Sequence, residues 1–137
     1  MSRPERMSLS AISPMILLLC SCGGSVPEKR EDLNSANILS GTDLAGGAKA
    51  VIERVYTGGA TGDTLHKAWI CQAGLSNCEL SAIIDTQDGP PPVWRSSPKM
   101  LDLMIAPTDV VWDFSNFSYL PGPSHRTIKV RLVERLV

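Results

Sequence analysis

The sequence predicts a small all-β domain, a sandwich or barrel of short antiparallel strands that follows a signal peptide and a flexible tether. Apolar and polar residues alternate in several short runs, as on strands with one buried face. Turn signals such as Asp88-Gly89 and Pro121-Gly122-Pro123 separate these runs regularly. Ten prolines in 137 residues leave little room for long helices.

The clearest predicted strand is near the end of the chain, where aliphatic residues at 128, 130 and 132 alternate with Lys129 and Arg131. Similar short runs cover residues 65–73, 80–86, 100–105 and 110–115. Within these runs, Trp69, Trp112 and Phe114 fall at positions that face a core.

Residues 48–56 allow two interpretations. Their apolar residues, at 51, 52, 55 and 56, have helical spacing. The run is short, however, and glycine-rich stretches lie on both sides of it. A strand is therefore the favoured interpretation, paired through residues 57–63 to the strand that follows.

The N-terminus has the features of a signal peptide. Arg3 and Arg6 make its beginning basic, and residues 7–19 carry no charge and end in five consecutive apolar residues. This stretch is shorter than the ~20 residues that a membrane-spanning helix needs.

The residues at its end, Leu19-Cys20-Ser21-Cys22, resemble the lipobox of bacterial lipoproteins. The resemblance implies cleavage before Cys22 and lipid attachment to its sulfur, so that residues 1–21 are removed. Cys20 departs from the small residue that is commoner at its position. Because Gly23 is not aspartate, the family's sorting rule implies the outer membrane, facing periplasm or surface, as the location of the anchored protein.

Residues 22–47 are expected to form the lipidated cysteine and a flexible linker, because they are rich in glycine, serine and asparagine and contain no aromatic residue. The folded domain is then expected over residues 48–137. A domain of this size is close to the lower limit at which a core is stable without a cross-link.

Cys71 and Cys78 are predicted to form a disulfide. A hairpin centred between Gly74 and Leu75 places the two cysteines opposite each other, at a separation that a disulfide can bridge. Redox pairs usually have the closer spacing Cys-x-x-Cys, and zinc sites need further ligands. An oxidised pair also agrees with export from the cytoplasm.

Several function classes lack support in the sequence. The chain has 13 basic and 14 acidic residues, so no excess of positive charge predicts binding to nucleic acid. His66 and His125 stand alone, without a serine-hydrolase elbow or a phosphate-binding loop. We therefore expect no catalytic residues, no metal and no cofactor.

Loop aromatics and the basic C-terminal segment are the candidate contacts with a partner. Aromatic and arginine side chains are favoured anchors in interfaces. The alternative is that the aromatics cover a core edge and that the basic side chains form a solvated strand face. The candidates are Trp94, Phe117, Tyr119, Arg126, Lys129 and Arg131.

A non-enzymatic envelope lipoprotein that binds a partner or supports the envelope is the leading hypothesis. Residues 48–117 resemble small uncharacterised bacterial proteins in which a tryptophan, here Trp94, precedes a strand; that family has no assigned activity. The alternative is an inhibitor or immunity-type lipoprotein acting on a lytic enzyme. Its basis is residues 69–74, which are similar to the aromatic-x-Cys strand of periplasmic lysozyme inhibitors, although their Ser-Gly loop is not found. A small envelope hydrolase is the least favoured hypothesis.

Overall fold

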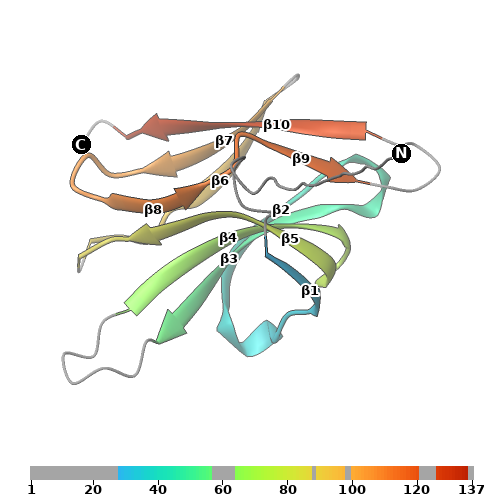
Figure 1. Ribbon diagram of the computed structural model, residues 1–137, viewed down its shortest axis with the longest axis horizontal. Helices are drawn as coiled ribbons and strands as arrows, with labels where there is room; N and C mark the ends of the chain where they lie inside the picture. The colour runs from blue at the N-terminus through green and yellow to red at the C-terminus, as the bar shows by residue number, and fades with distance from the viewer. Residues whose placement is uncertain (1–27, 57–63, 88, 98–99, 121–125, 136–137) are drawn as a thin grey trace, which may run out of the picture.

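The computed structural model describes residues 28–56, 64–87, 89–97, 100–120 and 126–135. These residues form two β-sheets that pack face to face, one above the other in Figure 1. The prediction of an all-β fold is confirmed. The predicted signal peptide and Cys22 lie outside the described residues.

The larger sheet has six strands and is antiparallel. Its strands are, in spatial order, β1 (Lys29–Asp32), β5 (Ser76–Asp85), β4 (Thr64–Ala73), β3 (Lys49–Tyr56) and β2 (Ile38–Asp43). The sixth strand, β8 (Val110–Phe114), pairs with the second half of β5, whereas β1 pairs with its first half. Two short 3-10 helices, η2 (Ser35–Asn37) and η3 (Ala45–Gly47), flank β2.

The smaller sheet has four strands in the order β6 (Val93–Ser97), β7 (Met100–Ile105), β10 (Arg126–Glu134) and β9 (Phe117–Leu120). β7 and β10 run parallel, which differs from the antiparallel pairing that the sequence predicts. The chain reaches this arrangement because, after β7, it first adds β8 to the other sheet and returns through β9.

The main core lies between the two sheets. It consists of side chains that alternate along the strands with outward-facing ones, as expected for a β-sandwich. Its buried members are Ala48, Ala50, Ile52, Ala68, Ile70, Ala82, Ile84, Trp94, Leu101, Leu103, Ile105 and Val130.

A second apolar cluster covers the outer face of the six-stranded sheet. It contains Val51, Trp69, Leu80 and the two cysteines, closed from outside by Leu33 with Ile38 and Leu75 packed against it. Residues 28–47 therefore belong to the folded domain. This corrects the expectation that a flexible linker extends through residue 47.

Residues 49–56 form the strand β3, and this strand is covered on both faces. Ile52 faces the main core and Val51 faces the second cluster, and both are fully buried. A strand covered on both faces carries consecutive apolar residues. For this reason the apolar residues of β3 have a spacing that resembles that of a helix.

The expectation that Trp112 faces the core is also corrected. Asp113 pairs with Ile83 and Val111 pairs with Ile84, so Trp112 is the extra residue of a β-bulge. The bulge changes the alternation along β8: Val111 and Phe114 pack against the core, whereas Trp112 is 62% exposed.

Candidate functional site

The outer face of the four-stranded sheet brings together charged side chains from three adjacent strands. Asp102, at the centre of β7, pairs with Arg95 of β6 on one side and with Arg131 of β10 on the other. Directly paired residues point to the same face of a sheet. Their chain neighbours Leu103 and Val130 are in the main core, so the three charged residues point away from it.

The two arginines cover the carboxylate between them. Arg95 Nη2 donates to Asp102 Oδ2 at 2.9 Å, and Arg131 donates through Nη2 to the same oxygen at 3.1 Å and through Nε to Oδ1 at 3.2 Å. Asp102 is only 1% exposed, whereas the arginine side chains are 58% and 57% exposed. The hydrogen bonds from Arg131 and then from Arg95 lower the pKa of Asp102, against the opposing effect of burial.

The next cross-strand row on this face adds a lysine and an aromatic ring. Lys129 of β10 pairs with Phe117 of β9, and both are exposed. Within the described part of the chain, no ion pair involves Lys129. We call Arg95, Asp102, Arg131, Lys129 and Phe117 the arginine face. Three cations against one carboxylate make it a locally positive surface.

The structure thus places three of the six predicted partner contacts, Phe117, Lys129 and Arg131, on one surface. Tyr119 is also exposed, and it lines a groove of about 390 Å³ together with Lys29 of β1 and Gln72 and Ile70 of β4. Ligand pockets usually have ~300–1,000 Å³, so this groove is at the small end of that range.

Two of the predicted contacts have other outcomes. Trp94 is 6% exposed in the main core, and its indole N–H donates to the carbonyl oxygen of Val51 at 2.9 Å. Its prediction as a partner contact is corrected, because β6 turns this side chain between the sheets. Arg126 begins β10, but its side chain lies outside the described residues.

Sequence reasoning missed Arg95 and Asp102, which form the centre of the arginine face. The only signal was a carboxylate within the apolar run 100–105. Its two partners depend on the register of β7 with β6 and with β10, which are contacts between strands that the sequence pattern alone does not pair.

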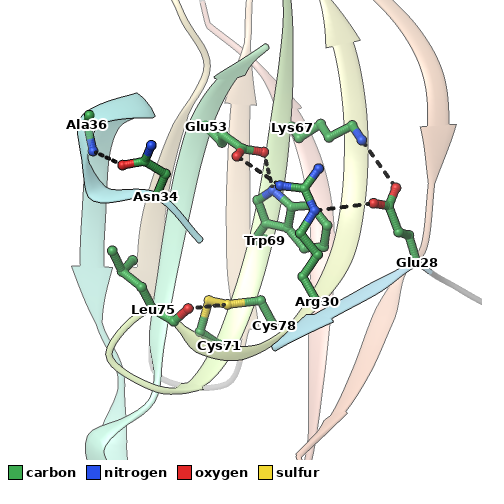
Figure 2. A network of polar contacts seen from close by, with 10 residues as sticks. All are labelled: Glu28, Arg30, Asn34, Ala36, Glu53, Lys67, Trp69, Cys71, Leu75 and Cys78. Carbon is green, nitrogen blue, oxygen red and sulfur yellow. Dashed lines mark hydrogen bonds and ion pairs between the residues drawn. A yellow bond between two sulfur atoms is a disulfide. The ribbon is translucent and has the colours of Figure 1, made fainter. Parts of the chain in front are cut away.

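The outer face of the six-stranded sheet carries a different polar network, which fixes β1 to the domain (Figure 2). The buried carboxylate of Glu53 accepts hydrogen bonds from Trp69 Nε1 at 3.0 Å and from Arg30 Nη1 at 3.2 Å. The Arg30 guanidinium also lies over the Trp69 ring, 5.3 Å from its centroid. A second cation, Lys67, lies 5.8 Å from that centroid and donates to Glu28 at 3.2 Å.

Cys71 and Cys78 are joined by a disulfide, as the sequence predicts. They face each other across the β4–β5 hairpin, where Gly74 and Asn77 adopt positive φ angles of 58° and 54°. Both cysteines are buried beside Trp69 in the second apolar cluster, so this disulfide reinforces the part of the sheet that β1 and Leu33 cover.

His66 lies buried at one end of the inter-sheet space. Its Nδ1 is 3.5 Å from the hydroxyl of Thr86, and its Nε2 has no hydrogen-bond partner among the described residues. Burial and then the charge of Arg54 lower its pKa, whereas Asp109 and Asp85 act in the opposite direction. Asp109 also has one buried oxygen, Oδ1, that no group in the described part of the chain contacts by a hydrogen bond. His125 lies outside the described residues.

No group of three or more potential metal ligands occurs among the residues that the structure describes. The same part of the chain contains no helix long and apolar enough to cross a membrane. Comparison of the chain with protein-family models, with curated proteins and with solved structures gives no match.

Proposed function

We propose that the chain is a lipid-anchored protein of the bacterial cell envelope that acts by binding rather than by catalysis. Its contact surface is the arginine face, and its partner is an anionic component of the envelope. The observation that carries this proposal is the convergence of Arg95 and Arg131 on one buried carboxylate, with exposed Lys129 and Phe117 in the neighbouring row.

Two observations support the location. The Cys71–Cys78 disulfide is of a kind that persists in oxidising compartments such as the periplasm. Glu28 already belongs to the domain, because its carbonyl oxygen accepts from the amide of Leu80, and it stands only six residues after the cysteine of the lipobox-like motif. Six residues span at most about 20 Å, so an anchor at Cys22 keeps the domain close to the membrane surface.

The composition of the arginine face supports binding. Arginine and aromatic side chains are enriched among the residues that dominate binding energy in interfaces. Its positive charge favours encounter with anionic partners, although the whole chain has a net charge of −1. The charge is thus distributed unevenly, with an excess of cations on one face.

A crosslinking pull-down of the full-length protein from its native envelope tests this proposal. We expect Phe117→Ala with Lys129→Gln to lose the partner that the unchanged protein retains. The matched control is Tyr56→Ala with Lys49→Gln, which removes an exposed aromatic ring and one charge from the six-stranded sheet. Equal retention by both double variants would contradict the assignment to the arginine face.

A further inference from the structure

The arginine face has hydrogen-bond donors that its own carboxylate does not use. A guanidinium carries five N–H groups. Arg131 directs Nε–H and one Nη2–H to Asp102, and Arg95 directs one Nη2–H there. No other acceptor contacts either guanidinium among the described residues, and more than half of each side chain is exposed to solvent.

The buried carboxylate also fixes where these donors are. Both Nη2 atoms contact the same oxygen, Asp102 Oδ2, so they lie no farther apart than the sum of their two distances, 2.9 and 3.1 Å. Two long side chains on different strands are thereby held together in one orientation. Preorganised donors bind an anion better than freely rotating ones, because less conformational entropy is lost on binding.

The number of positive charges favours a phosphate group over a carboxylate. One guanidinium matches a carboxylate through two parallel hydrogen bonds, as Arg131 already does with Asp102. A phosphate monoester carries up to two negative charges and three acceptor oxygens. It can therefore accept from both guanidiniums at once, and Lys129, two residues before Arg131 on β10, adds a third positive charge to the same face.

We infer that Arg95 and Arg131, positioned by Asp102, form a binding site for a phosphate group carried by an envelope component. This inference rests on the proposed function and specifies the chemistry of its ligand. Asp102 has a positioning role, because it orients the two arginines without contacting the ligand.

The test follows the Nε–Hε NMR signals of Arg95 and Arg131 in the full-length protein, purified in detergent, at constant ionic strength. We expect inorganic phosphate to shift both signals in a saturable manner and acetate to have a much weaker effect. Mixed micelles that contain phosphatidic acid, compared with phosphatidylcholine alone, show whether the same site also accepts a lipid phosphate. Arg95→Gln or Arg131→Gln should reduce phosphate affinity about tenfold or more, whereas Lys49→Gln should not.

Asp102→Asn separates this site from a diffusely positive surface. The substitution removes a negative charge, so simple electrostatic attraction predicts tighter phosphate binding. Loss of the positioning carboxylate predicts weaker binding, by about tenfold. Unchanged or tighter binding by Asp102→Asn, or equal responses to acetate and phosphate, would overturn the inference.

The two proposals can fail separately. A partner that is retained by the arginine face, with no response to phosphate, would leave the proposed function standing and refute the phosphate site. A specific phosphate response, with no partner lost in the Phe117 and Lys129 variant, would support the site and refute the wider binding surface.

Discussion

Two carboxylates are buried on opposite outer faces of the sandwich, and arginine covers each of them. Glu53 is neutralised by Arg30 and accepts a hydrogen bond from the indole N–H of Trp69, and the same arginine also pairs with Glu28. Asp102 is contacted by two arginines, which leaves a positive charge in excess. Removing one partner of such a buried pair is strongly unfavourable, because the remaining charge stays buried. The Glu53 network thus stabilises the fold, whereas the Asp102 cluster also has donors left for a ligand.

The lowered pKa of His66 predicts that the stability of the domain depends on pH. Burial holds its pKa in the folded protein below the ordinary value of 6.5, so the unfolded chain binds a proton at a higher pH than the folded one. The free energy of unfolding should therefore be largest above pH 6.5 and should decrease as the pH falls, until His66 is protonated in the folded state too.

Urea unfolding over a series of pH values from about 8 to about 5 measures this effect. In His66→Gln the decrease should be much smaller, because the titrating group is absent. The lowered pKa of Asp102 places its own contribution at more acidic pH. An undiminished decrease in the His66 variant would assign the pH dependence to another group.

Among the strands, sequence patterns were sufficient where the alternation was long and clear, and they missed the short strands β6 and β9 that precede β7 and β10. The β4–β5 hairpin and its disulfide follow from two apolar runs around a turn, and β7 has the bounds of the predicted run 100–105. β1 and β2 were missed because they are short and largely polar edge strands. Leu33, in the segment between these two strands, is buried against Trp69 and the cysteines.

The candidate site was less predictable than the fold, because its residues come from strands whose pairing the sequence pattern does not specify. Lys129 and Arg131 were found because they alternate along one strand. Phe117 was also named, and its strand β9 directly precedes β10. Arg95 and Asp102 were missed, because Asp102 meets Arg131 across the parallel pair β7–β10, 29 residues away in sequence. Register between such strands is decided by packing in the whole sandwich, and local alternation does not contain that information.

Because residues 28–47 belong to the domain, two leucines of this segment should contribute differently to its stability. Leu33→Ala should lower the free energy of unfolding by about 2 kcal/mol, because it leaves a cavity above Trp69 and the disulfide. Leu39→Ala should cost less than about 0.5 kcal/mol, since Leu39 is 37% exposed. Urea unfolding curves measure both changes. Similar small effects of the two substitutions would restore the view that this segment is only a linker.

For the molecule as a whole, the packing of β1 and Leu33 onto the six-stranded sheet limits how far the domain could move from a lipid anchor at Cys22. A linker through residue 47 would allow the domain to move far from the membrane. With β1 fixed to the sheet by Arg30, Glu53 and Leu33, Cys22 stands no more than six residues from a residue of the domain, Glu28. The arginine face of an anchored molecule therefore encounters partners in or next to the membrane, and this restricts the search for them.

The proposed anchor at Cys22 gives the last prediction. Cys22→Ala should move the protein from the membrane fraction to the soluble fraction and abolish labelling with radioactive palmitate, since the lipids contribute ~0.8 kcal/mol per buried CH₂. Cys20→Ala should keep both properties, because Ser21-Cys22 still supplies the small residue and the cysteine at the expected cleavage position. Palmitate labelling that persists in Cys22→Ala, or that is lost only in Cys20→Ala, would contradict an anchor at Cys22. It would also remove the distance limit on the arginine face, because that limit is counted from Cys22.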